Sequence, residues 1–263
     1  MGAFPIPPRK RDVSSPGFSP EDEERYGRQV ILPEIGWEGQ ERLKSGKVLV
    51  VGAGGLGSAA LWYLAAAGVG RLKVVDGDAV ELSNLQRQIL HSTADLGRPK
   101  AESARESLTR LNPHCLVEIC ARRLDAANVS RTLSGWDLVL DCTDNFPTRL
   151  VLADCCWREG KTLVTAAVQD FSGHLMVVDP KAGSPCYRCL LPEPPGEAPG
   201  PLGIVGAVAG VMGCLQALEA LKLLIGRPSR LTHHLLAFDG LRSSFRRLER
   251  QRTPGCPLCG GSP

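Results

Sequence analysis

Residues 48–78, VLVVGAGGLGSAALWYLAAAGVGRLKVVDGD, constrain the fold of this chain more than any other stretch. We interpret them as an apolar strand, a glycine-rich turn, a helix of small residues and a second apolar strand followed by an acid. This order is typical of the first βαβ unit of a nucleotide-binding sheet. The sequence therefore predicts a nucleotide site at the turn.

The glycines of this turn let the backbone bend sharply and approach a phosphate, and the helix that follows adds its N-terminal dipole. Asp76 follows the second strand, about 20 residues after the turn, where a carboxylate can bind ribose hydroxyls. The pattern alone does not distinguish NAD from ATP. The glycines concerned are Gly52, Gly54, Gly55 and Gly57.

Apolar runs and helical patterns alternate along most of the chain, as in a doubly wound α/β fold. We expect strands of a parallel sheet at residues 48–51, 72–75, 115–120, 137–142 and 162–168. After Gly173 the rhythm changes, and residues 174–179, 233–239 and 243–249 are expected to form antiparallel strands around a helix at 206–225. The predicted fold class is a mostly parallel, Rossmann-like sheet extended by antiparallel C-terminal strands.

Composition argues against several classes of function. The formal net charge is only +3 and no run of five like charges occurs, so a nucleic-acid partner is not predicted. Residues 198–218 lack charge, but their prolines and glycines favour a buried core helix over a membrane span. The first residues contain no apolar run typical of a secretion signal, so we expect a cytoplasmic protein whose residues 1–20 form a flexible leader.

Two Cys-x-x-Cys pairs stand out among the ten cysteines. In a reducing compartment such pairs bind zinc more often than they form disulfides, and four thiolates leave the metal no open position. We therefore predict a structural zinc site that holds the C-terminal segment to the domain, with a redox role as the weaker alternative. The predicted ligands are Cys186, Cys189, Cys256 and Cys259. The other cysteines are predicted to be buried side chains: Cys115, Cys120, Cys142, Cys155, Cys156 and Cys214.

Charged residues near the predicted strand ends favour ATP over a redox dinucleotide. Arg87 and Lys100 follow Asp76 closely, and Asp144 follows the fourth predicted strand. Cations neutralise the β- and γ-phosphates of a reacting triphosphate, whereas backbone amides suffice for the pyrophosphate of a dinucleotide. Asp144 is placed at the carboxyl end of a central strand, where an acid is suited to hold Mg²⁺.

Six motifs resemble the MoeB/ThiF/HesA family of E1-like adenylyltransferases: RYGRQVILPEIG, GAGGLGS, SNLQRQILH, GRPKAESA, DCTDN and CYRCL. The resemblance covers about residues 21–260 and implies one adenylation domain over residues 21–263. Its nucleotide-binding part is expected at about residues 46–170, and its carrier-binding and zinc part at about residues 171–260. The implied reaction is ATP-dependent adenylation of the C-terminal Gly-Gly carboxylate of a small ubiquitin-like sulfur carrier, with release of pyrophosphate.

The resemblance also implies roles for individual residues. Arg28 is expected to reach the triphosphate bound by the other protomer, which implies a homodimer. Lys100 and Arg87 are expected to contact phosphates, and Asp144 to hold Mg²⁺. The remaining implied nucleotide contacts are Gly55, Asp76, Ser83, Asn84, Leu85, Gln86 and Asn145.

One departure from the family changes the expected chemistry. Many relatives carry a cysteine in the crossover loop that links covalently to the carrier, but here no cysteine occurs between Cys189 and Cys214. We therefore expect adenylation without an enzyme–carrier thioester, with sulfur from a separate persulfide donor. The pathway stays open among molybdopterin, thiamine and related biosynthesis. Two alternative functions also stay open: an NAD-dependent oxidoreductase and a non-catalytic, zinc-stapled binding module.

Overall fold

An eight-stranded sheet forms the centre of the computed structural model, which describes residues 17–193, 200 and 203–260. Its strand order is β3-β2-β1-β4-β5-β6-β7-β8. The strands are β1 (Lys47–Val51), β2 (Arg71–Val75), β3 (Leu116–Cys120), β4 (Leu138–Asp141), β5 (Thr162–Gln169), β6 (Ser172–Val178), β7 (His234–Asp239) and β8 (Ser244–Glu249). Every predicted strand is present, and its ends differ from the prediction by no more than two residues.

The strands β3, β2, β1, β4 and β5 run parallel, and their register brings their carboxyl ends to one edge of the sheet. Val51 at the end of β1 pairs with Val75 of β2 and with Asp141 of β4. Ligands of open α/β sheets bind at this edge. The strands β6, β7 and β8 continue the sheet in antiparallel pairs. The predicted fold class is therefore confirmed.

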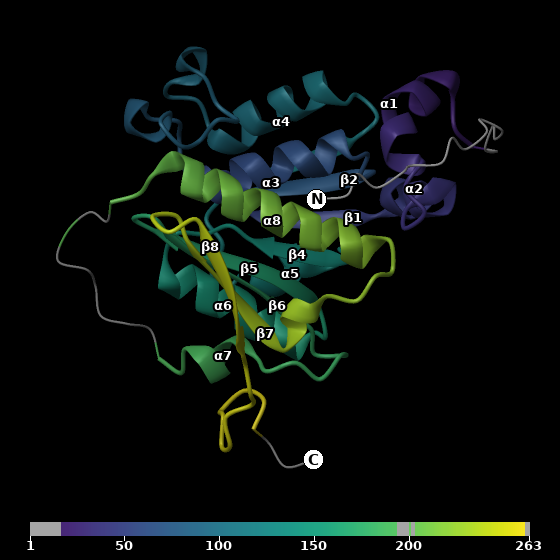
Figure 1. Cartoon of the computed structure of the whole chain (residues 1–263). Helices are drawn as coiled ribbons and strands as arrows, with labels where there is room; N and C mark the ends of the chain where they lie inside the picture. Colours follow the sequence, from purple (N-terminus) through teal and green to yellow (C-terminus); the bar gives the residue numbers. More distant parts are fainter. Residues whose placement is uncertain (1–16, 194–199, 201–202, 261–263) are drawn as a thin grey trace.

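Helices cover both faces of the sheet (Figure 1). They are α1 (Pro20–Val30), α2 (Gly36–Ser45), α3 (Gly55–Ala66), α4 (Lys100–Leu111), α5 (Val129–Leu133), α6 (Phe146–Arg158), α7 (Tyr187–Leu190) and α8 (Gly206–Leu224). The sequence does not predict α5 and α7, because helices of five and four residues are too short to show a periodic pattern.

Alternate side chains of β1 enter two separate cores. Val48 and Val50 pack with residues of α3, α4 and α8, whereas Leu49 and Val51 pack with residues of α5 and α6. Figure 1 shows α3, α4 and α8 on one side of the sheet and α6 and α7 on the other. Because helices cover both faces, the central strands are apolar on both sides.

The long helix α8 lies against α3 and the sheet. Gly213 permits the close approach, since a Cβ there would stand 2.3 Å from the carbonyl oxygen of Leu56. Within the described part of the chain, α8 is the one helix long and apolar enough to cross a membrane. Its Met212, Ala217 and Ala220 are buried in the core, as predicted for a core helix.

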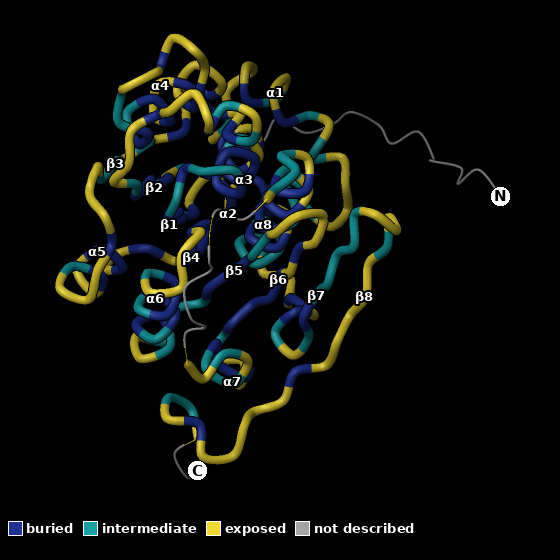
Figure 2. Tube along the Cα trace, turned by 90° about the vertical axis from the view of Figure 1, so that its left-hand side faces the viewer, coloured by how far each residue is buried: buried dark blue, intermediate teal, exposed yellow. Residues whose placement is uncertain are grey.

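The sheet is buried at its centre and exposed at its last strand. Figure 2 shows central strands that are buried and an edge strand, β8, that is mostly exposed. Of the predicted leader, residues 1–16 lie outside the described residues, while Ser19 caps α1 and Pro20 begins it. Residues 194–199 and 201–202 of the predicted crossover loop also lie outside the described residues.

Candidate active site

The glycine-rich turn between β1 and α3 has the tight geometry expected of a phosphate turn. Gly52 adopts a φ of +98°, in the left-handed region that favours glycine. A Cβ at Gly57 would stand 1.9 Å from the carbonyl oxygen of Gly52, so only glycine lets α3 begin this close to the strand. At Gly54 the nearest atom to such a Cβ is Gln88 Nε2, at 3.7 Å, which leaves its backbone open to a ligand.

Asp76 and His91 hold this turn from two sides. Asp76 Oδ2 accepts a hydrogen bond of 2.8 Å from the amide of Ala53. His91 Nε2 lies 3.0 Å from the carbonyl oxygen of Ala53, which can only accept, so Nε2 carries the proton. Burial lowers the pKa of His91, which keeps the ring neutral at pH 7. This role of His91 could not be predicted from the sequence, because only the fold brings His91 to the turn.

A cavity of about 1030 Å³ opens at the carboxyl ends of the parallel strands and extends toward β6 and α7. It brings most of the predicted site together. The predicted residues that line it are Gly52, Gly54, Gly55, Asp76, Arg87, Lys100, Asp144 and Asn145. The predicted residues that do not line it are Arg28, Gly57, Ser83, Asn84, Leu85 and Gln86.

Lys100 lines the cavity and forms an ion pair with Asp78. It is the first residue of α4, its side chain is buried, and its Nζ lies 3.5 Å from Asp78 Oδ2. The guanidinium of Arg123 lies 3.0 Å from Asp78 Oδ1. Burial raises the pKa of Asp78, but Arg123 and Lys100 outweigh burial and hold it below its usual value. Asp78 and Arg123 are not among the residues predicted from the sequence, although Asp78 lies only two residues after Asp76.

The segment after β2 presents Arg87 to the cavity. Asn84 is buried, and its Oδ1 accepts a hydrogen bond of 3.2 Å from the amide of Glu81, which caps the short 3₁₀ turn Leu82–Asn84. Arg87 Nη1 donates to the carbonyl oxygen of Ser83 at 3.1 Å. Ser83 and Asn84 therefore shape the segment that carries Arg87.

Asp144 and Asn145 follow β4 and lead into α6. Asn145 Oδ1 accepts a hydrogen bond of 3.0 Å from the amide of Thr148 and caps the helix. Among the described residues, the only hydrogen bond to the Asp144 carboxylate comes from Asn145 Nδ2, at 3.5 Å. An exposed carboxylate beside a cavity with room for phosphates fits Mg²⁺, which usually binds one or two carboxylates together with phosphate oxygens.

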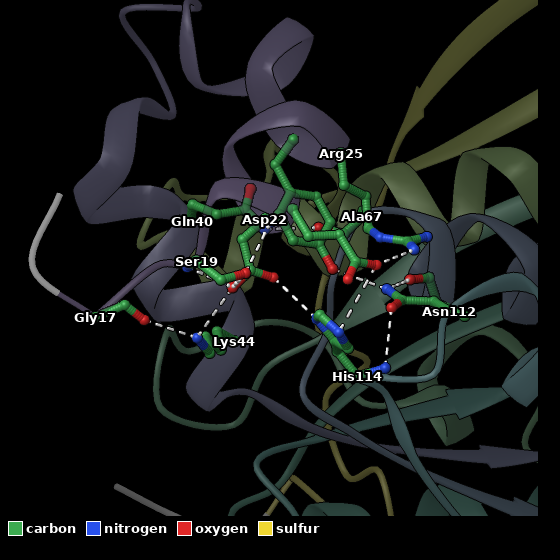
Figure 3. A network of polar contacts seen from close by, with 12 residues as sticks. Gly17, Ser19, Asp22, Arg25, Gln40, Lys44, Ala67, Asn112 and His114 are labelled. Atoms are coloured by element: carbon green, nitrogen blue, oxygen red, sulfur yellow. Dashed lines mark hydrogen bonds and ion pairs between the residues drawn. The ribbon is translucent and has the colours of Figure 1, made fainter. Parts of the chain in front are cut away.

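Arg28 lies outside this cavity, in the last turn of α1. Figure 3 shows the polar contacts that hold α1 in place. Asp22 Oδ1 lies 3.0 Å from His114 Nδ1, and Asn112 donates to the hydroxyl of Tyr26 at 2.8 Å. The helix that carries Arg28 is therefore fixed to the turn before β3, and Arg28 does not line the cavity.

The four cysteines of the two Cys-x-x-Cys pairs lie together at α7 and the segment after β8. Their sulfur atoms all lie within 4.8 Å of one another. The Sγ atoms of Cys186 and Cys256 are 3.5 Å apart, and those of Cys189 and Cys259 are 3.2 Å apart. Four thiolates at this spacing have the donor set and size of a tetrahedral zinc site, with Zn–S bonds of about 2.3 Å.

The remaining cysteines confirm the prediction only in part. Cys120 and Cys214 are half-buried rather than buried, since Cys120 ends the edge strand β3 and Cys214 lies beside the exposed face of α8. Burial raises the pKa of the thiols of Cys142 and Cys214, so neither is a thiolate at neutral pH. The cysteines that are buried as predicted are Cys115, Cys142, Cys155 and Cys156.

A glycine turn, a strand-end aspartate, two cations and a free carboxylate thus share one cavity, and four cysteines cluster beside the antiparallel extension. This fold and site define an E1-like adenylyltransferase. The chain belongs to the ThiF family, whose sequence pattern matches residues 26–258.

Curated relatives support this assignment over nearly the whole chain. A sulfur carrier protein adenylyltransferase from Thermus thermophilus is 47% identical, and the match covers 94% of this chain and 94% of that protein. A SAMP-activating enzyme E1 from Haloferax volcanii is also 47% identical, over 90% of this chain and 88% of that protein. The adenylyltransferase and sulfurtransferase MOCS3 from Drosophila sechellia is 46% identical over 96% of this chain, which spans only 58% of that protein.

Solved structures share the fold at lower identity. The structure of E. coli MccB with MccA-N7isoASN has a TM-score of 0.80 at 23% identity and covers 91% of this chain and 75% of that one. The structure of PaaA has a TM-score of 0.80 at 21% identity, over 93% of this chain and 78% of that one. These similarities show the fold alone.

Proposed function

We propose that this protein uses ATP to adenylate the C-terminal Gly-Gly carboxylate of a small ubiquitin-like sulfur carrier and releases pyrophosphate. The single cavity that joins the glycine turn, Asp76, Lys100 and Asp144 carries the proposal. The similarity to a sulfur carrier protein adenylyltransferase and to a SAMP-activating enzyme E1 supports adenylation, and therefore ATP rather than NAD as the nucleotide. We place the reaction in the cytoplasm, where a reducing environment keeps cysteines available as thiols.

The chemistry needs alignment and charge neutralisation rather than a general base. A carboxylate is ionised at neutral pH and attacks the α-phosphorus once it is held in line with the leaving pyrophosphate. Lys100 and Arg87 neutralise the charge that develops on the leaving group. Asp76 binds the ribose. Asp144 would hold Mg²⁺, which supplies further neutralisation of the phosphates when bound.

The far end of the cavity is suited to the tail of the carrier. Beyond the parallel strands the cavity wall includes Ala167, His174 and Met176 of β5 and β6, and Tyr187 of α7. This wall combines apolar and polar side chains, which suits an extended Gly-Gly tail with its main-chain groups. The nucleotide-binding part therefore occupies about residues 46–170, and the carrier-binding part about residues 171–260.

The body of the carrier docks on β7 and β8. Leu241 and Phe245 of this region are 72% and 50% exposed. Phe245 stacks on its cross-strand partner Phe238, with ring centroids 4.7 Å apart. Exposed apolar groups on an edge strand favour a protein partner. Zinc bound by the four clustered cysteines fixes the segment that follows β8.

The active form is a homodimer in which Arg28 of one protomer reaches the nucleotide of the other. Arg28 lies on α1, and no carboxylate pairs with it among the described residues. Tyr63, Leu82 and Ile89 are 57%, 71% and 62% exposed, and exposed apolar side chains of this size suit contacts with a second copy.

The reaction proceeds without an enzyme–carrier thioester. No cysteine occurs between Cys189 and Cys214, and Cys214 is a half-buried thiol within α8. Sulfur therefore comes from a separate persulfide donor, for molybdopterin, thiamine or related biosynthesis.

Pyrophosphate exchange with ATP tests the proposal, using the purified chain and a panel of carriers that end in Gly-Gly. Exchange that requires one carrier, and that fails when its last glycine is removed, is the expected result and identifies the pathway. ATP binding without exchange in any member of the panel contradicts the proposal and leaves a binding module. A stable, thiol-cleavable conjugate of enzyme and carrier contradicts the absence of a thioester.

A further inference from the structure

Arg250 is a buried cation for which the described residues provide no carboxylate partner. It directly follows β8 and is only 8% exposed. Its Nη2 donates hydrogen bonds to the main-chain carbonyl oxygens of Thr232 at 2.9 Å and Val177 at 3.1 Å, but its Nε is buried with no partner there. Burying a charge without a counter-charge is costly, so a cation held in this way points to a nearby anion.

The segment after β8 places this cation beside the four clustered cysteines. Arg250 Nη2 lies 3.4 Å from the carbonyl oxygen of Pro185, the residue before Cys186. Three residues further along the chain, the amide of Thr253 donates to Cys189 Sγ at 3.4 Å. Burial lowers the pKa of Arg250 to about 10, whereas negative charge on Cys189 and Cys186 acts in the opposite direction. Arg250 is therefore charged at neutral pH and close enough to the cysteines to interact with their charge.

Zinc changes the charge of this cysteine cluster. Four thiols are neutral, whereas Zn²⁺ bound by four thiolates leaves two negative charges uncompensated, and the displaced protons pass to solvent. The ligands Cys186 and Cys256 are buried, so water and salt screen the charge of the cluster poorly. A zinc-loaded cluster is therefore stabilised by a cation in its surroundings.

The other cations of these segments are less suited to that role. Arg188 lies inside the first Cys-x-x-Cys pair, but it already pairs with Asp154, with Nη2 and Oδ2 2.8 Å apart. Arg252 is exposed and lies over the ring of Trp157, 5.6 Å from the ring centroid. An exposed charge contributes little, because water screens it. Arg250 is the cation that is both buried and without a carboxylate partner in the described part of the chain.

We propose that Arg250 is the buried counter-cation of the zinc-loaded cysteine cluster, so that its charge favours the loaded form over the form without zinc. Attraction between the guanidinium and the anionic cluster raises the affinity for zinc. In the absence of the metal the cluster loses most of its negative charge, and the same guanidinium becomes a buried charge without compensation. This role concerns the zinc site and is independent of the proposed adenylation.

The test measures zinc affinity by competition with a chelator, and thermal unfolding with and without zinc. Arg250→Met removes the charge but keeps an unbranched side chain, and Arg250→Lys keeps the charge. Arg246→Met, which removes an exposed cation from β8, is the control. Arg250→Gln, which is neutral but can still donate to a main-chain carbonyl oxygen, replaces Arg250→Met if that variant does not fold.

Arg250→Met should bind zinc about 10- to 100-fold more weakly than wild type, the range typical of losing a group that supports metal ligands. Its melting temperature should fall more with zinc than without zinc, because only the loaded cluster attracts the guanidinium. Arg250→Lys should recover most of the lost affinity, and Arg246→Met should bind zinc as wild type does. A role in hydrogen bonding alone predicts equal falls in melting temperature and an unchanged zinc affinity.

Folded, neutral Arg250 variants that bind zinc as tightly as wild type overturn the inference. Equal losses of affinity in Arg250→Lys and Arg250→Met also overturn it, since the shape of the side chain would then matter rather than its charge. A wild-type chain that binds no zinc does the same. None of these results bears on adenylation, which pyrophosphate exchange tests separately.

Discussion

The amide of Ala53 and the carboxylate of Asp76 are joined by a hydrogen bond of 2.8 Å that ties the glycine turn to the end of β2. Asp76 therefore braces the glycine turn, and under the proposed function it also binds the ribose hydroxyls. Substitutions can separate these two roles.

Replacing Asp76 with alanine is expected to lower both stability and ATP affinity, because the brace and the ribose contact are lost together. Asp76→Asn keeps one oxygen that can accept from Ala53 but loses the acceptor for the amide of Asp78, so its melting temperature should fall less than that of Asp76→Ala. Its ATP affinity should still fall by about tenfold, since hydrogen bonds to charged groups contribute about 1.5–3 kcal/mol. Calorimetry and thermal unfolding measure the two effects. Wild-type ATP affinity in Asp76→Asn refutes the ribose role.

Lys100→Ala is expected to reduce the rate of pyrophosphate exchange by about 100-fold, as for other losses of preorganised charge at a leaving group. The control is Arg105→Ala, which removes an exposed cation elsewhere on α4. Asp78→Asn releases Lys100 and Arg123 from their shared partner and should change exchange less than Lys100→Ala does. A Lys100→Ala variant as active as the control removes Lys100 from the mechanism.

The sequence predicts this site well where it depends on the topology of the sheet. Gly52, Asp76 and Asp144 each follow a parallel strand, and the carboxyl ends of such strands meet at one edge, so their proximity follows from the order of elements. The cysteine cluster is predictable for a different reason, because the Cys-x-x-Cys spacing itself encodes the ligand geometry.

Contacts between side chains of distant segments could not be predicted in the same way. Lys100 and Arg123 both pair with Asp78, and these contacts depend on how the start of α4 lies against the end of β2. No periodic pattern in the sequence indicates that arrangement. The burial of Cys214 depends on the rotation of α8 against α3, and the prediction was wrong there. The role of Arg28 stays a prediction, because it needs a second protomer.

Removing zinc should loosen the segment after β8, whereas the nucleotide-binding part of the chain should stay folded. We expect about one zinc per chain by metal analysis, lost on chelation or in Cys256→Ser together with a lower melting temperature. Cys214→Ser is the matched control, since its half-buried thiol lies outside the cluster, and it should retain zinc. A chain purified without metal and equally stable with and without chelator would contradict a structural zinc site.

The contacts of Asp22 shown in Figure 3 predict a loss of stability in acid. Burial raises the pKa of Asp22, but hydrogen bonds from Ser19 and His114 and the charge of Lys44 outweigh burial and hold it below its usual value. A carboxyl with a lowered folded pKa adds stability above its unfolded pKa, near 4, and that stability is lost as pH falls through the folded pKa.

Asp22→Asn removes this contribution. The free energy of unfolding at pH 7 should fall by about 1–3 kcal/mol, and its dependence on pH between about 5 and 3 should become weaker than in wild type. Glu24→Gln, an exposed change on the same helix, is the control. Denaturant unfolding at several pH values measures both quantities, and parallel pH profiles for Asp22→Asn and wild type exclude Asp22 as the cause.

Two glycines of the same turn should respond in opposite ways to an added methyl group. A Cβ at Gly57 overlaps the carbonyl oxygen of Gly52, a backbone atom that cannot move aside, at 1.9 Å. Gly57→Ala should therefore lower the free energy of unfolding by about 3 kcal/mol or more. At Gly54 the nearest atom lies 3.7 Å away, at the flexible end of Gln88, so Gly54→Ala should fold normally.

The added methyl of Gly54→Ala instead occupies the space through which a phosphate approaches the backbone. ATP affinity should fall by about tenfold or more while the melting temperature stays near that of wild type. Thermal unfolding with and without ATP separates the two variants in one experiment. Because ATP stabilises the native state to a degree set by its affinity, Gly54→Ala should show little shift on addition of ATP. A full shift in Gly54→Ala means that phosphates do not lie against this part of the turn.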